Sequence, residues 1–162
     1  MSPVRRQSEI ANDPARTARP VVLCVDDDLA ILSSLRRQFR GEPYELMTAG
    51  NAAQALAALR RHPVSVIISD ERMPDRTGSE LLAEVRERWP WIGRVLLTAY
   101  PGQEIVTRSF DAGADYLIYK PWDDGSLKRM VRHLTEGSER ARRRADEGIV
   151  ESAGLDLGGE GG

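Results

Sequence analysis

Short apolar runs alternate with helical patterns between residues 20 and 135. The apolar runs are the kind of segment that forms strands buried on both faces, and they predict strands at 21–25, 44–49, 64–69, 94–97 and 116–119. After each run, apolar residues recur at the i, i+3, i+4 spacing of an amphipathic helix. This spacing predicts helices at 28–40, 51–61, 79–89, 101–112 and 126–135.

The strand-helix alternation repeats along the chain with short connections, which indicates a parallel sheet covered by helices on both faces. Right-handed crossovers restrict the topology. We therefore predict an α/β fold with a doubly wound five-stranded parallel sheet in the strand order 2-1-3-4-5. In such a sheet the ligand site lies at the carboxyl ends of the strands, near the point where the strand order reverses.

Acidic residues follow the first and third predicted strands. Asp26 and Asp27 come directly after the first strand, and Asp70 ends the third. Asp28 has a structural explanation, because it is placed to cap the following helix. The other three carboxylates would lie close together and repel one another unless a cation is bound. Carboxylate oxygens at a partly hydrated site are the ligands of Mg²⁺ or Mn²⁺.

The fourth and fifth strands end in Thr98 and Lys120, which should reach the same edge of the sheet. A metal ion, an ammonium group and a hydroxyl group beside a carboxylate would suit a tetrahedral dianion. The predicted chemistry is phosphoryl transfer to an aspartate. A nucleotide site is disfavoured, because the first turn reads D-D-D where a glycine-rich loop would be needed. A hydrolase G-x-S-x-G elbow and a Cys/His zinc spacing are absent from the sequence.

Composition is that of an ordinary soluble protein, with a net charge of −2 that suggests neither nucleic acid nor an anionic membrane as a partner. No apolar run is long enough to span a bilayer, and the N-terminus lacks the apolar core of a secretory signal. The single cysteine, Cys24, lies within an apolar run and is expected to be buried. We therefore expect a cytoplasmic protein.

Three regions are predicted along the chain. Residues 1–19 contain prolines and arginines without periodicity and are expected to form a flexible arm. Residues 20–135 form the folded domain. Residues 136–162 are expected to be a polar extension of the last helix to about Glu147, followed by a disordered Gly-rich tail.

Four motifs in order resemble the receiver domain of two-component response regulators, the CheY-like family. They are V-D-D at 25–27, D-x-x-M-P-x-x-x-G at 70–78, L-T-A at 97–99 and K-P at 120–121. The resemblance covers residues 20–135, and the K-P-W-D ending at 120–123 resembles a subset of these regulators. It implies a flavodoxin-like fold of five strand-helix units.

The resemblance implies that Asp70 is the phosphoacceptor, which takes its phosphoryl group from a histidine kinase or a histidine phosphotransfer protein. Asp27 would bind Mg²⁺ directly, Asp26 mainly through water, and the backbone carbonyl of Arg72 would complete the metal site. The protein would not be a conventional enzyme, because it would catalyse only its own phosphorylation and dephosphorylation.

Thr98 and Lys120 would contact the phosphoryl group, and the Lys120-Pro121 bond would be cis. Phosphorylation would then change the face formed by the fourth helix (101–112), the fifth strand (116–119) and the fifth helix (126–135), where a downstream partner would bind.

The sequence departs from the family at Leu117, where an aromatic residue usually moves together with the threonine. The ordinary switch is therefore in question. Arg72 and Tyr100 each lie two residues after a site residue, at positions that control the access of water, and both are bulky. We expect slow autodephosphorylation.

Three functions were compared. The preferred one is a stand-alone signalling module controlled by phosphorylation, and the first alternative is a constitutive interaction scaffold that does not depend on phosphorylation. The third, nucleic-acid binding through the basic run 140–144, is disfavoured because helix-turn-helix patterning is absent and acidic residues flank the run. The sequence leaves homodimerisation open.

Overall fold

A five-stranded sheet forms the centre of the molecule, with its strands in the order β2-β1-β3-β4-β5. The computed structural model describes residues 19–100 and 102–155. The strands are β1 (Val21–Val25), β2 (Glu45–Ala49), β3 (Val64–Asp70), β4 (Gly93–Thr98) and β5 (Tyr116–Tyr119). All neighbouring strands pair in parallel, and every residue of β1 and β3 is buried. The predicted topology is confirmed.

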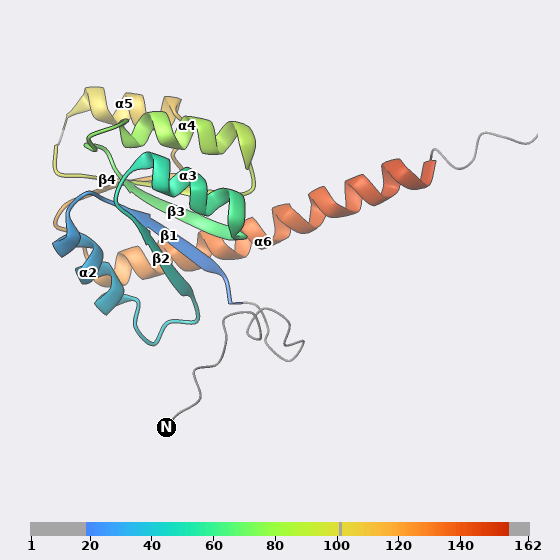
Figure 1. Cartoon of the computed structure of the whole chain (residues 1–162), viewed down its shortest axis with the longest axis horizontal. Helices are drawn as coiled ribbons and strands as arrows, with labels where there is room; N and C mark the ends of the chain where they lie inside the picture. Colours follow the sequence, from blue (N-terminus) through green and yellow to red (C-terminus); the bar gives the residue numbers. More distant parts are fainter. Residues whose placement is uncertain (1–18, 101, 156–162) are drawn as a thin grey trace, which may run out of the picture.

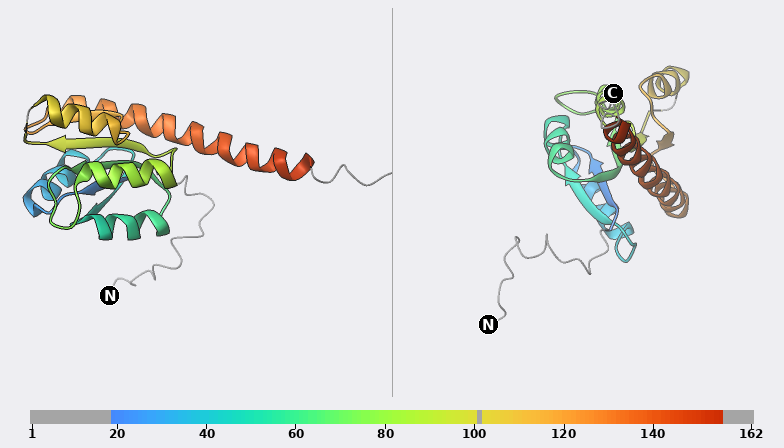
Figure 2. Two further views of the ribbon diagram at one scale, coloured as in Figure 1. Left: turned by 90° about the horizontal axis from the view of Figure 1, so that it is seen from above. Right: turned by 90° about the vertical axis from the view of Figure 1, so that its right-hand side faces the viewer.

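Helices cover both faces of the sheet, as Figures 1 and 2 show. They are α2 (Leu29–Gln38), α3 (Ala52–Arg61), α4 (Gly78–Arg88), α5 (Gln103–Asp111) and α6 (Asp124–Leu155). Alternate strand residues point to opposite faces, so two apolar cores form. One core packs Leu23 and Ile67 against α3 and α4, and the other packs Val22 and Ile68 against α2 and α6.

Polar side chains fix where the helices start. The Asp28 side chain accepts a hydrogen bond from the Ala30 backbone N–H at 2.9 Å, so its predicted role as an N-cap is confirmed. Asn51 caps α3 and Thr77 caps α4 in the same way. Each cap satisfies a backbone donor at a helix start, and together the caps set the turns that follow β1, β2 and β3.

The last helix extends further than the sequence predicted. α6 is 32 residues long, continues past Glu147 to Leu155, and projects beyond the sheet in Figure 1. Gly148 weakens a helix but does not end one, because a mid-helix glycine costs only about 1 kcal/mol. Pro101, the predicted start of the fourth helix, lies outside the described residues, as do most of the predicted arm (1–18) and the end of the Gly-rich tail (156–162).

Among the helices of the described ranges, 19–100 and 102–155, none combines the length and the apolar character that a membrane crossing requires.

Candidate functional site

Three carboxylates converge at the carboxyl ends of β1 and β3. Asp26, Asp27 and Asp70 each offer an oxygen, and these oxygens all lie within 4.8 Å of one another. The parallel pairing of β1 with β3 produces this convergence, because it brings Val25 beside Ser69 and so aligns the residues that follow. Asp26 is buried and Asp27 is exposed. The grouping predicted from the strand ends is thus what the structure shows.

Lys120 provides the positive charge of this cluster. Its Nζ donates to Asp26 Oδ2 at 2.9 Å and to Asp70 Oδ1 at 3.0 Å. Its backbone N–H donates to the Thr98 carbonyl oxygen at 2.8 Å, which fixes the end of β5 against β4. The Lys120-Pro121 peptide bond is cis, as expected.

Burial and nearby charges shift the pKa values of Asp70 and Lys120. Burial raises the pKa of Asp70 above its usual value, and the nearby Asp26 and Asp27 charges add to this, while the hydrogen bond from Lys120 opposes it. Burial lowers the pKa of Lys120, but its bonds to Asp26 and Asp70 outweigh this effect and raise the pKa overall. Lys120 therefore stays charged, and the carboxylates keep an excess of negative charge that a cation would relieve.

Thr98 ends β4 beside the cluster and is fully buried. Its Oγ1 accepts a hydrogen bond from the Tyr100 backbone N–H at 3.1 Å. The guanidinium carbon of Arg72 lies 3.6 Å from the centre of the Tyr100 ring, a stacked cation-π contact. The sequence identified both bulky residues, but not that they contact each other and join two strand-end loops.

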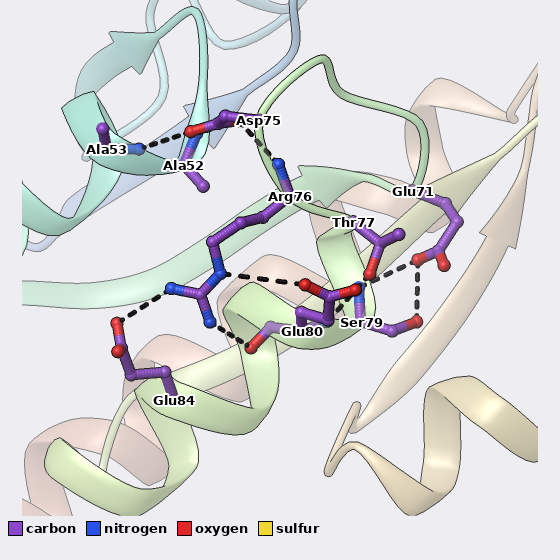
Figure 3. Close-up of polar contacts among 9 residues, drawn as sticks. All are labelled: Ala52, Ala53, Glu71, Asp75, Arg76, Thr77, Ser79, Glu80 and Glu84. Atoms are coloured by element: carbon purple, nitrogen blue, oxygen red, sulfur yellow. Dashed lines mark hydrogen bonds and ion pairs between the residues drawn. The ribbon is translucent and has the colours of Figure 1, made fainter.

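The loop between β3 and α4, residues 71–77, is fixed at several points (Figure 3). Asp75 accepts hydrogen bonds from the backbone N–H groups of Ala52 and Ala53 at 3.2 and 3.0 Å, which ties the loop to the start of α3. Arg76 reaches Glu84 of α4 at 3.4 Å. The sequence pattern does not predict these contacts, because the direction of a side chain in a loop has no periodic signal.

Glu71 fixes the start of α4 from the same loop. Its Oε2 accepts from the Ser79 backbone N–H at 2.9 Å and from Ser79 Oγ at 2.7 Å (Figure 3). Gly78 lies directly beside the end of β3, because its N–H donates to the Glu71 carbonyl oxygen at 2.9 Å. A Cβ at this position would overlap the Asp70 carbonyl oxygen. The glycine of the sequence motif is therefore required by close packing.

Comparison with known proteins agrees with this geometry. Residues 22–132 match the family model described as the response regulator receiver domain. The chain belongs to this family. The match includes the carboxylate cluster, Thr98 and Lys120, so the site described above lies wholly within the receiver domain.

The receiver domain is similar to parts of longer regulators. It is 43% identical over 116 residues to the hydrogenase transcriptional regulatory protein HoxA of Cupriavidus necator, covering 71% of this chain and 24% of that protein. It is 34% identical over 138 residues to the alginate biosynthesis transcriptional regulatory protein AlgB of Pseudomonas aeruginosa, covering 79% of this chain and 30% of that protein. The chain thus spans about a quarter to a third of these relatives.

Solved structures of receiver domains share the fold. The signal receiver domain of an HD domain-containing protein from Pseudomonas fluorescens Pf-5 is 32% identical, with a TM-score of 0.72 over 75% of this chain and 98% of that one. A CheY-like receiver domain from Methanospirillum hungatei is 30% identical, with a TM-score of 0.70 over the same shares.

The carboxylate cluster of this receiver domain fits a magnesium ion. Its donors are hard oxygens from separate side chains, and the exposed Asp27 leaves room for water ligands. Both Asp26 oxygens already accept protein hydrogen bonds, from the Asp28 N–H and from Lys120, and the expected indirect role of Asp26 at the metal stays a prediction. The role of the Arg72 carbonyl stays a prediction.

Proposed function

We propose that this receiver domain is phosphorylated on Asp70 by a histidine kinase or a histidine phosphotransfer protein, with Mg²⁺ held by Asp26, Asp27, Asp70 and the Arg72 carbonyl. The observation that carries the proposal is the convergence of three carboxylate oxygens within 4.8 Å, beside a lysine bonded to two of them. Such a cluster of like charges is costly unless it serves a cation and an anionic group.

In the proposed reaction an Asp70 carboxylate oxygen attacks the phosphorus of phosphohistidine. The new P–O bond forms as the P–N bond breaks, and the imidazole leaves with the electron pair. Bound Mg²⁺ would supply charge neutralisation for the phosphoryl oxygens. Lys120, which contacts Asp70 at 3.0 Å, would donate to one phosphoryl oxygen, and the Thr98 hydroxyl would donate to another.

Intact mass spectrometry tests the phosphoacceptor. We expect wild type to gain one phosphoryl group on incubation with acetyl phosphate and Mg²⁺. The gain should disappear when Mg²⁺ is chelated and in Asp70→Asn, whose amide cannot act as the nucleophile. Asp28→Asn is the matched control, since Asp28 caps α2 and is not expected to accept a phosphoryl group. A gain that persists in Asp70→Asn would contradict the assignment.

We further propose that autodephosphorylation is slow, because the stacked Arg72 and Tyr100 side chains restrict the approach of water to Asp70. The double variant Arg72→Ala, Tyr100→Ala should lose phosphate several-fold faster than wild type once acetyl phosphate is removed. The decay is followed by intact mass. A wild-type phosphate that decays much faster than that of the double variant would contradict the idea.

The output is proposed to be a downstream protein that binds the face formed by α5, β5 and α6. Two of these elements carry large aromatic residues that are about half exposed, Phe110 in α5 and Tyr119 in β5, and a partner could cover them. The constitutive scaffold is not favoured, because it gives no reason for the charged cluster. The stand-alone action of the module, its cytoplasmic location and its lack of a nucleic-acid partner stay predictions. Homodimerisation stays open.

A further inference from the structure

Only one of the two carboxylate oxygens of Glu71 accepts a hydrogen bond from the described residues. Glu71 follows the acceptor Asp70 directly and is 5% exposed. Its Oε2 holds Ser79, but its buried Oε1 has no hydrogen-bond partner among the described residues. Leaving a buried charged oxygen without a partner is unfavourable. A cation that comes within hydrogen-bond distance of this oxygen would therefore stabilise it.

The nearest cation is Arg108 of α5. Its Nη1 lies 3.8 Å from Glu71 Oε1, which is too long for a hydrogen bond. The Arg108 side chain is 54% exposed, so it is free to move. A pocket of about 430 Å³ lies at this junction, lined by both residues and also by Thr98, Tyr100 and Ile105. Arg108 thus has both an unsatisfied partner and space to reach it.

Leu117 of β5 provides no aromatic ring that could move together with Thr98. It is partly buried and packs into the core beneath α3, α4 and α5, together with Ile105. A leucine has no ring to fill the space that Thr98 would vacate, and no hydroxyl to form a hydrogen bond there. Thr98 lines the same pocket as Arg108 and Glu71. A movement of Thr98 towards Asp70 would therefore enlarge the space that Arg108 faces.

We propose that Glu71 and Arg108 form the link between the acceptor and α5. When phosphorylated Asp70 draws Thr98 towards it, the Arg108 guanidinium closes onto Glu71 Oε1 and pulls α5 towards the sheet. A charge-assisted bond of this kind favours the closed state about tenfold or more. The inference rests on the proposed phosphorylation of Asp70, and it assigns to an ion pair the task that a ring performs in relatives.

The variants Glu71→Gln and Arg108→Gln test the link in the full chain. The amide oxygen of Glu71→Gln can still accept from Ser79 but lacks the charge that attracts Arg108. Arg108→Lys keeps the charge and loses the forked geometry. Arg129→Gln is the matched control, because Arg129 is an exposed arginine of α6 paired with Asp123.

The readout is hydrogen exchange of the α5 amides, 103–111, with and without acetyl phosphate and Mg²⁺. Intact mass of the same samples reports phosphoryl uptake. We expect phosphorylation to slow α5 exchange several-fold in wild type and Arg129→Gln. The response should be largely lost in Glu71→Gln and Arg108→Gln, and partly kept in Arg108→Lys. The double variant Glu71→Gln, Arg108→Gln should lose no more of the α5 response than either single variant does.

The outcomes separate the two proposals. Normal phosphoryl uptake with an unchanged α5 response in Glu71→Gln or Arg108→Gln overturns the link and leaves the proposed function standing. An α5 that does not respond in phosphorylated wild type also overturns the link alone. Absence of phosphoryl uptake in wild type overturns the proposed function, and the link with it. Arg108→Gln changes an exposed side chain, so the test remains decisive if Glu71→Gln fails to fold.

Discussion

Replacement of Gly78 by alanine tests how closely α4 approaches β3. A Cβ at Gly78 would overlap the Asp70 carbonyl oxygen and come within 2.8 Å of Leu96 Cδ1. The Asp70 carbonyl belongs to the central strand β3, and the Gly78 N–H is bonded to the Glu71 carbonyl at 2.9 Å. Neither backbone segment can move without disturbing the sheet or the start of the helix.

The expected magnitude follows from two opposing effects. Extra atoms forced into a packed site cost about 1–3 kcal/mol. Replacing a helical glycine by alanine otherwise gains about 0.5–1 kcal/mol. Because the clash is with backbone atoms, we expect Gly78→Ala to lower the free energy of unfolding by about 1–2 kcal/mol. Urea unfolding followed by tryptophan fluorescence measures this value.

Gly137→Ala is the matched control, because Gly137 lies within α6 and an added Cβ there meets nothing within 4 Å. The control should gain about 0.5–1 kcal/mol, since only the helix preference acts. The dependence of stability on urea should be unchanged in both variants. A Gly78→Ala protein as stable as wild type would refute the close approach of α4 to β3.

Three further variants or probes test other parts of the structure. Because the pKa of Asp70 is higher in the folded than in the unfolded protein, the free energy of unfolding of the metal-free protein falls as the pH rises from the unfolded-state pKa to the folded-state pKa. Asp70→Asn should therefore raise the Tm measured in EDTA at neutral pH, and a lower Tm would contradict this. Asp75→Ala removes the acceptor of two backbone N–H groups at the start of α3 and should lower the free energy of unfolding in urea by about 0.5–2 kcal/mol. Asp146 is exposed, so Asp146→Ala should leave this free energy almost unchanged. Burial raises the pKa of Cys24 to about 12, so native protein should resist iodoacetamide that labels it in urea; rapid native labelling would disprove its burial.

Local composition was enough to predict the sheet and most of the site. Apolar runs end abruptly at charged residues, and parallel pairing brings those ends together, so the sequence alone predicts that Asp26, Asp70 and Lys120 lie on one edge of the sheet. Asp28 could be separated from its neighbours because a cap has a recognisable position ahead of a helical period.

Contacts between distant segments could not be predicted in this way. The stacking of Arg72 on Tyr100 and the bonds from Asp75 to the start of α3 depend on how loops fold above the sheet. Side-chain direction in a loop has no periodic signal. The predicted α6 is too short because the apolar pattern fades after Glu136, whereas glycines and charged residues weaken a helix without ending it.

The long helix α6 continues well beyond its last contact with the sheet. The helix begins at Asp124, shortly after Lys120, and Arg142 is the last described side chain that bonds to the sheet, through the Val64 carbonyl at 3.3 Å. Roughly 20 Å of helix lies beyond Arg142, at 1.5 Å per residue. A tilt of about 10° around that point would move the far end by about 3.5 Å. The same tilt would move the start of the helix by about 5 Å, because about 27 Å of helix separates Asp124 from Arg142. The buried Leu127 and Val131 lie on that stretch, so the far end of α6 cannot swing in this way unless the core beneath the helix repacks.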